Sequence, residues 1–276
     1  MNKDLISVET LKDHLEDSNL IIFDATIPKA GNSNTKITSE CIPNALFFDL
    51  KKVFSVQDSK FPNTLPLEKQ FEENARKLGV NSNSLIVIYD QHGVYSSPRA
   101  WWLFKLMGHK TVYVLDGGLI AWKNSGFNTE LEFRTSKLIG NFKVNYDYSL
   151  VSSKNKVLSK INDESIQVLD ARSSKRFLAL EEEPRDGLRS GHIPSSKNLH
   201  YSSLIIDGVF IPNSKINSVF KAFNLNDKEI IYSCGSGITA CILALAGVQI
   251  GINNFSVYDG SWSEWGALHE LPIETE

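Results

Sequence analysis

The chain has 276 residues, of which 42% are hydrophobic and 22% charged, and its formal net charge is −3. That length allows one large domain or two modest ones that fold without disulfides, and three cysteines favour a reducing compartment. The slightly acidic balance of charges gives no basic surface for nucleic acid or anionic lipid. No apolar run approaches the roughly 18 residues of a membrane span. We therefore expect a cytoplasmic protein without nucleic-acid or membrane partners.

Helices and strands are predicted to alternate along the first half. Ser7 can cap a helix with Val8, Leu11 and Leu15 on one face. Further elements follow in this order: strands 20–23 and 45–48, helix 67–78, strand 85–89, helix 98–107, strand 112–115 and helix 119–124. Short apolar runs between helices indicate an α/β fold, with a mainly parallel sheet covered on both faces.

The second half repeats this order, with strands at 168–169, 197–199, 230–233 and 256–258 and a helix at 239–248. Asp24-Ala25 recurs as Asp170-Ala171, and residues 85–122 align without a gap to 228–265, an offset of 143. A duplicated unit predicts two domains, 1–128 and 151–276. The linker at 129–150 is expected to be ordered, because scattered apolar residues such as Leu138 and Phe142 could pack.

One loop differs between the two copies. After strand 230–233 the second copy reads Cys-Gly-Ser-Gly-Ile-Thr-Ala over residues 234–240, and a helix of small residues follows. At the same offset the first copy has Gln91 in place of Cys234. Only the second loop therefore offers a thiol nucleophile.

The residues of this second loop favour a reactive thiol. A strand delivers Cys234 to the edge of the sheet where open α/β folds bind ligands. Gly235 and Gly237 permit positive φ, and the amides near Thr239 can form an anion nest. Such a nest stabilises a thiolate or the outer sulfur of a Cys–S–S⁻ persulfide. The alternative is a buried cysteine at a tight turn.

Other candidates for chemistry are fewer. Cys41 and Cys241 lie among apolar neighbours and are interpreted as structural. No Cys-x-x-Cys occurs and the histidines lack metal-ligand spacing, so we expect no metal and no organic cofactor. The second copy also carries Arg172, Arg176 and Arg185, whose planar guanidinium groups could hold a small anionic substrate beside the thiolate. They could equally be solvated arginines of a surface loop.

These motifs resemble the tandem-domain sulfurtransferases of the rhodanese superfamily and, within it, the 3-mercaptopyruvate branch. The resemblance covers nearly the whole chain. It rests on Asp24-Ala25 and on segments 95–102, 116–119, 183–185, 191–194, 234–240 and 258–265. The uncharged loop residues 235–237 are typical of the mercaptopyruvate branch, whereas the thiosulfate:cyanide branch carries basic residues there.

The resemblance implies two rhodanese-like domains, the first catalytically inactive. It implies that sulfur moves from 3-mercaptopyruvate to a thiol or cyanide through a persulfide, releasing pyruvate. The expected partners are a small anionic sulfur donor and a thiol acceptor, such as a reduced thioredoxin-like protein or a small thiol. The implied catalytic residues are Cys234 and Ser236, and the implied substrate-binding residues are Tyr95, Arg176, Arg185, Gly235, Gly237, Ile238 and Thr239.

The chain departs from the family at a proposed proton relay to the loop serine. Asp49 is followed by Leu50-Lys51, and Asn63 stands where some members carry histidine. That relay is therefore dispensable here, or proton handling differs.

Three rival functions remain open. A thiosulfate sulfurtransferase would use the same persulfide. A cysteine phosphatase needs Cys-x₅-Arg, but the residue six after Cys234 is Ala240. A non-catalytic binding module or a sulfur relay is the third, and the intact cysteine loop argues against the binding module.

Overall fold

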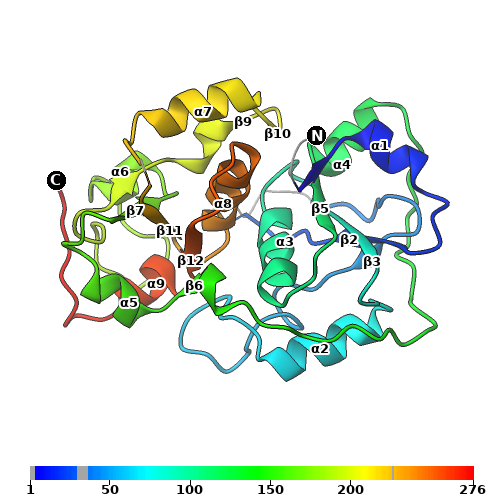
Figure 1. The fold of residues 1–276 in the computed structure, drawn as a ribbon, viewed down its shortest axis with the longest axis horizontal. Helices are drawn as coiled ribbons and strands as arrows, with labels where there is room; N and C mark the ends of the chain where they lie inside the picture. Colours follow the sequence, from blue (N-terminus) through cyan, green and yellow to red (C-terminus); the bar gives the residue numbers. More distant parts are fainter. Residues whose placement is uncertain (1–3, 30–36, 226) are drawn as a thin grey trace. The chain divides into compact units, whose positions relative to one another are not determined.

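The computed structural model describes residues 4–29, 37–225 and 227–276 and divides into two compact units (Figure 1). The first unit comprises Met1–Asp58, Leu65–Asp147 and Asp207–Phe210. The second comprises Ser59–Thr64, Tyr148–Ile206 and Ile211–Glu276. Each unit thus includes a short segment from the other half of the sequence, which the repeat did not predict.

The first unit contains a parallel sheet of strand order β1-β5-β4-β2-β3. Its strands are β1 (Leu5–Ile6), β2 (Leu20–Asp24), β3 (Leu46–Phe47), β4 (Leu85–Tyr89) and β5 (Val112–Leu115), and its helices are α1 (Val8–Asp13), α2 (Glu68–Lys77), α3 (Ser97–Leu106) and α4 (Gly118–Asn124). The predicted cap is confirmed, because the Ser7 hydroxyl accepts the N–H of Thr10 at 3.2 Å.

Helices cover both faces of this first sheet. Neighbouring residues of a strand point to opposite faces. Ile22 packs in one core with Leu11 of α1 and Trp122 of α4. Its neighbour Phe23 stacks on Phe104 of α3, with ring centroids 5.7 Å apart.

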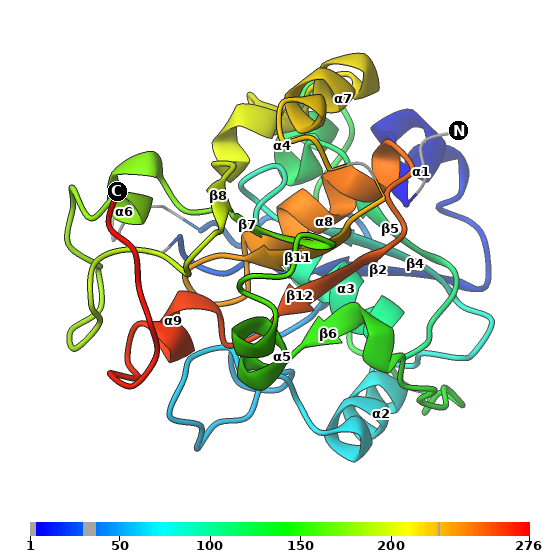
Figure 2. The same cartoon turned by 60° about the vertical axis from the view of Figure 1, so that its left-hand side comes forward.

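The second unit repeats the topology, with strand order β6-β12-β11-β7-β8, again parallel. Its strands are β6 (Val151–Ser152), β7 (Ile166–Asp170), β8 (Lys197–Asn198), β11 (Glu229–Ser233) and β12 (Phe255–Tyr258), and its helices are α5 (Lys154–Ser159), α6 (Ser174–Phe177), α7 (Asn213–Lys221), α8 (Ala240–Gln249) and α9 (Ser261–Trp265). The turned view in Figure 2 shows α8 on one side of β11 and β12, with α5 and α9 on the other. The predicted α/β fold with two similar domains is confirmed.

The remaining elements are short. The described residues also form strands β9 (Ile205–Ile206) and β10 (Val209–Phe210) and two 3₁₀ turns, Tyr148–Leu150 and Tyr201–Leu204. In the connector, Phe142 is buried against Phe71, as expected, but the side chain of Leu138 is 79% exposed. Among the described residues, no helix is both long enough and apolar enough to cross a bilayer.

Candidate active site

Cys234 is the first residue after β11, and six residues later α8 begins. Strand β11 is the middle strand of the second sheet, and the carboxyl end of such a strand is where open α/β folds bind ligands. The residue is 1% exposed. Its carbonyl accepts the N–H of Trp262 at 2.9 Å, so a hydrogen bond from α9 anchors the backbone of the loop at Cys234.

The two loop glycines have different roles. Gly237 has φ +77°, a left-handed conformation that favours glycine, as predicted. Gly235 is not among the residues with positive φ, so that part of the prediction is wrong. A Cβ at Gly235 would stand 3.0 Å from Nη2 of Arg176, so glycine lets this guanidinium approach the loop.

Three backbone amides at the start of α8 are available for the predicted nest. They belong to Ile238, Thr239 and Ala240, and none of them has a hydrogen-bond acceptor among the residues that the structure describes. Helix α8 has ten residues, so its N-terminal N–H groups also carry the positive end of a helix dipole. The loop is therefore built to receive negative charge.

Sheet register corrects the alignment of the two loops. The N–H of Ala25 donates to the carbonyl of Tyr89 at 2.9 Å, and the N–H of Ala171 donates to that of Ser233 at 2.8 Å. Tyr89 is thus the counterpart of Ser233, and Asp90, not Gln91, stands where Cys234 stands. Helix α3 begins seven residues after Asp90 but α8 begins six after Cys234, so the first loop has one extra residue.

The carboxylate of Asp90 fills the nest of the first loop. Its Oδ2 accepts the N–H groups of Tyr95, Ser96 and Ser97 at 2.8, 2.9 and 2.9 Å and the Ser97 hydroxyl at 2.7 Å. Its Oδ1 accepts the N–H of His92 at 2.9 Å. The first copy therefore shows what this loop shape binds: an anionic atom held by amides at a helix N-terminus.

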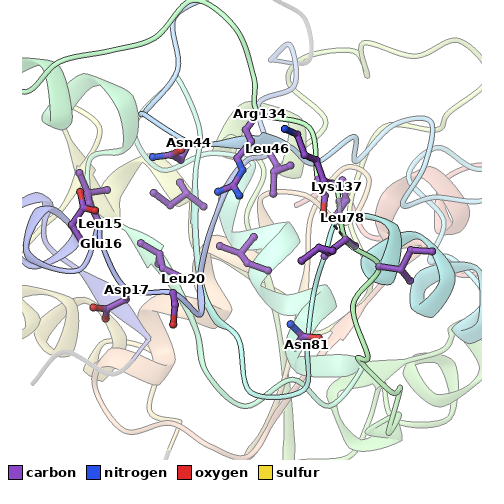
Figure 3. Close-up of a pocket in the computed structure, with 17 residues that line it drawn as sticks. Leu15, Glu16, Asp17, Leu20, Asn44, Leu46, Leu78, Asn81, Arg134 and Lys137 are labelled. Carbon is purple, nitrogen blue, oxygen red and sulfur yellow. Dashed lines mark hydrogen bonds between the residues drawn. The ribbon is translucent and has the colours of Figure 1, made fainter.

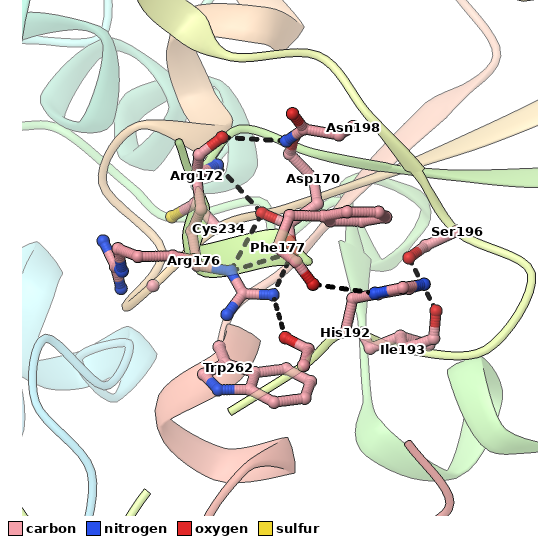
Figure 4. Close-up of polar contacts among 12 residues, drawn as sticks. Asp170, Arg172, Arg176, Phe177, His192, Ile193, Ser196, Asn198, Cys234 and Trp262 are labelled. Atoms are coloured by element: carbon pink, nitrogen blue, oxygen red, sulfur yellow. Dashed lines mark hydrogen bonds and ion pairs between the residues drawn. The ribbon is translucent and has the colours of Figure 1, made fainter. Parts of the chain in front are cut away.

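A buried cluster of charges supports the second loop. The Arg172 guanidinium donates to Asp170 and, at 2.7 Å, to Glu183, and all three side chains are at most 2% exposed. Figure 4 shows Arg172 between the Asp170 carboxylate and the ring of Trp262, whose centroid is 4.3 Å from Cζ of Arg172. Cys234 is labelled on the neighbouring loop.

Arg176 belongs to the same cluster rather than to a solvated surface. Its Nε donates to Oε1 of Glu183 at 3.2 Å and its Nη2 bonds Oε2 of the same carboxylate. Glu183 thus offsets part of the Arg176 charge beside the loop. Burial lowers the pKa of nearby His200, and the charge of Arg176 lowers it further.

Arg185 and Asn63 both contact Ser236. Nη2 of Arg185 is 3.3 Å from the Ser236 hydroxyl oxygen, and Nδ2 of Asn63 is 3.0 Å from the same atom. Asn63 also donates to the Ser236 carbonyl at 3.0 Å. The family resemblance placed Asn63 at a relay position that serves the loop serine, and the two residues are 173 positions apart in the sequence.

Ser261 is a site residue that the sequence analysis missed. Its hydroxyl oxygen accepts the N–H of Cys234 at 3.2 Å and lies 3.9 Å from Sγ. Its φ is +49°, whereas the corresponding first residue of α4 is a glycine, Gly118, at φ +52°. The comparison of the two copies was the signal: a serine holds a left-handed conformation where its counterpart is glycine, at a cost of roughly 1–3 kcal/mol.

Replacement of Ser261 by alanine is expected to lower the free energy of unfolding by about 1–3 kcal/mol, because the buried N–H of Cys234 loses its acceptor. The Ser261→Gly variant should lose less, since glycine adopts the positive φ without strain. Urea denaturation of the three proteins measures this order. An alanine variant as stable as the glycine variant would contradict it.

The other cysteines have structural surroundings, as expected. Burial raises the pKa of the Cys41 thiol to about 11, and the carboxylates of Glu130 and Asp24 contribute. The Cys241 thiol is buried in α8 and donates to the carbonyl of Gly237 at 3.4 Å. Both groups are therefore poor nucleophiles at neutral pH.

Tyr95, a predicted substrate-binding residue, lies in the first unit, with Nζ of Lys29 5.2 Å from its ring centroid. Its role at the substrate stays a prediction. The first unit also contains a pocket of about 890 Å³ between the connector and the sheet, lined by residues such as Leu20, Leu46 and Arg134 (Figure 3). No predicted site residue lines it.

Known proteins match nearly the whole chain. The rhodanese-like domain model matches residues 7–125 and again 153–268. The chain is 34% identical over 274 residues to 3-mercaptopyruvate sulfurtransferase of Escherichia coli, across 98% of this chain and 97% of that protein. It is 33% identical to the mitochondrial thiosulfate/3-mercaptopyruvate sulfurtransferase 1 of Arabidopsis thaliana, across 98% of this chain and 78% of that protein.

A solved structure agrees with these matches. The crystal structure of SseA from Escherichia coli aligns with a TM-score of 0.83 at 31% identity, covering 94% of this chain and 99% of that one. The resemblance predicted from the motifs is confirmed. With two matched domains and relatives of this identity over nearly its full length, the chain belongs to the family of proteins built from rhodanese-like domains.

Proposed function

We propose that this chain is a sulfurtransferase that takes sulfur from 3-mercaptopyruvate, carries it on Cys234 as a persulfide and passes it to a thiol. The names of the matched relatives from Escherichia coli and Arabidopsis thaliana support this activity. The first unit has no thiol at the corresponding position, so the second unit performs the chemistry.

The contrast between Asp90 and Cys234 carries the proposal. In a carboxylate, Oδ2 lies two bonds beyond Cβ, and in a Cys–S–S⁻ group the outer sulfur also lies two bonds beyond Cβ. Asp90 therefore has the shape and charge of a persulfide, and four donors of its loop bind Oδ2. The free amides at the start of α8 suit the outer sulfur of a Cys234 persulfide.

The charges beside the loop suit a donor with a single carboxylate. Glu183 already pairs with Arg176, so Arg185 supplies the less compensated positive charge. Arg185 and the outer face of Arg176 are proposed to bind the carboxylate, with loop residues 235–239 completing the site. The uncharged side chains at 235–237 favour this donor over dianionic thiosulfate.

The proposed reaction balances without an added oxidant. The Cys234 thiolate attacks the donor sulfur, and the S–S bond forms as the C–S bond breaks. The electron pair of that bond leaves as the enolate of pyruvate, whose carbon takes up the proton of the donor thiol. Cys234 is then a persulfide anion, and a thiolate or cyanide removes its outer sulfur and restores the thiolate.

The acceptor and the compartment belong to the proposal too. A reduced thioredoxin-like protein or a small thiol fits the second step, since either can supply a thiolate. The three free cysteines suit the reducing cytoplasm, although one matched relative is named mitochondrial.

Intact-mass spectrometry tests the proposal. Mixing the protein with 3-mercaptopyruvate should add one sulfur atom and release one pyruvate, and peptide mapping should place the sulfur on Cys234. The Cys41→Ala variant is the matched control and should load equally. Sulfur on Cys41 or Cys241 would contradict the mechanism, and faster loading from thiosulfate would reverse the donor assignment.

A further inference from the structure

The hydroxyl group of Ser236 receives two hydrogen bonds whose direction is fixed. Asn63 presents one amide atom to both the carbonyl and the hydroxyl oxygen of Ser236, at 3.0 Å each. A carbonyl oxygen has no proton to give, so the amide atom that faces it is the NH₂ nitrogen. Asn63 therefore donates to the hydroxyl oxygen, and Arg185, which has no acceptor atom, donates to it as well at 3.3 Å.

Two accepted hydrogen bonds occupy both lone pairs of the hydroxyl oxygen, so its own proton must point elsewhere. Among the described residues, none accepts that proton. Ser236 is 7% exposed, which keeps bulk water from competing for it. The hydroxyl is thus held as a hydrogen-bond donor.

The backbone of Asn63 has a conformation that costs free energy. Its φ is +59°, in the left-handed region where asparagine is among the better-tolerated side chains. The residue is only 9% exposed. Its amide cannot take up a proton near neutral pH, so it cannot relay one from Ser236.

We propose that Asn63 is a positioning residue that, with Arg185, holds Ser236 as a hydrogen-bond donor to the keto oxygen of the departing pyruvate enolate. This inference rests on the proposed function. In an α-keto acid the keto oxygen is attached next to the carboxylate carbon, so a donor beside Arg185 lies close to it. The negative charge that appears on this oxygen as the C–S bond breaks makes the hydrogen bond stronger in the transition state than in the bound donor.

The two half-reactions separate this role from a purely structural one. Only the first half-reaction generates an enolate, whereas discharge of the persulfide to cyanide does not. Single-turnover pyruvate release and thiocyanate formation from the preloaded persulfide measure the two steps. Slow variants can be loaded by longer exposure to 3-mercaptopyruvate.

The decisive variant is Asn63→Asp, which keeps shape and tolerates the same φ but accepts the Ser236 proton instead of donating. It should slow pyruvate release about 10- to 100-fold, as should Ser236→Ala, and change persulfide discharge less than about threefold. Asn63→Gly keeps the backbone conformation and leaves the Ser236 hydroxyl free to rotate. Its rate of pyruvate release should therefore fall less than that of Asn63→Asp.

Equal slowing of both half-reactions by Asn63→Asp would overturn the inference, because a distorted loop would affect both. Pyruvate release at the wild-type rate would also overturn it. If the wild-type protein released no pyruvate, the proposed function itself would fail, which is a different result from a changed ratio of the two steps.

Discussion

Substitution of Cys234 by serine is expected to lower turnover with 3-mercaptopyruvate by about 10⁴-fold or more, because a hydroxyl neither ionises near neutral pH nor forms a persulfide. No other described cysteine can substitute for it. Burial raises the pKa of the Cys41 thiol to about 11, and the Cys241 thiol donates to the carbonyl of Gly237. Steady-state pyruvate release measures the loss, and turnover within tenfold of wild type would contradict the assignment.

A second variant at this position tests the role of the nest. Cys234→Asp should be equally inactive, yet its thermal midpoint should exceed that of Cys234→Ser. The new carboxylate can reach the amides of Ile238, Thr239 and Ala240, as Asp90 reaches those of its own loop. An aspartate variant no more stable than the serine variant would show that the nest does not bind an anion at this distance.

The Glu183→Gln variant is expected to lower the free energy of unfolding by about 3–5 kcal/mol. The Glu183 carboxylate is 1% exposed and bonds both Arg172 and Arg176. A neutral amide removes the charge that compensates these two guanidinium groups. Urea or guanidinium denaturation measures the change.

The adjacent Glu182 provides a matched control for this substitution. Glu182 is exposed, so Glu182→Gln changes the same net charge one residue away and should stay within about 0.5 kcal/mol of wild type. Similar stability of the two variants would show that Glu183 does not hold the arginine cluster together.

The main strands and helices could be predicted because their apolar periodicity is strong and occurs twice. Strands β1 and β6 have only two residues each, and α6 and α9 have four and five, which is too short for any periodicity to show. One of these short strands nevertheless lies at the edge of each sheet. The strands are defined only by their pairing, β1 with β5 and β6 with β12.

The site was only partly predictable. Cys234 and its loop could be found because a thiol, glycines and a following helix are adjacent in sequence. The roles of Asp90 and Glu183 could not be predicted. The role of Asp90 depends on a single extra residue in its loop, and the role of Glu183 depends on which guanidinium groups its carboxylate contacts. A gapless alignment concealed the first, because α3 and β5 after the loop are offset from α8 and β12 by 143 residues, whereas β4 before the loop is offset from β11 by 144.

The contact between Asn63 and Ser236 could be expected from the family resemblance but not from the repeat. Ser59–Thr64 belongs to the second compact unit although it lies in the first half of the sequence. Sequence repeats compare each residue with its counterpart, and they carry no information about a segment that packs with the other copy.

The carboxylate of Asp90 also makes the two units unequal in their response to the substrate. The anion of the first loop is part of the covalent chain, so the stability of that unit is independent of sulfur supply. Under the proposed function, the amides of the second unit gain the outer sulfur of a persulfide as a partner when Cys234 carries sulfur, and whatever binds the folded state alone stabilises it. We therefore expect folding of the second unit to be thermodynamically coupled to its sulfur load, and the first unit to behave as if permanently loaded.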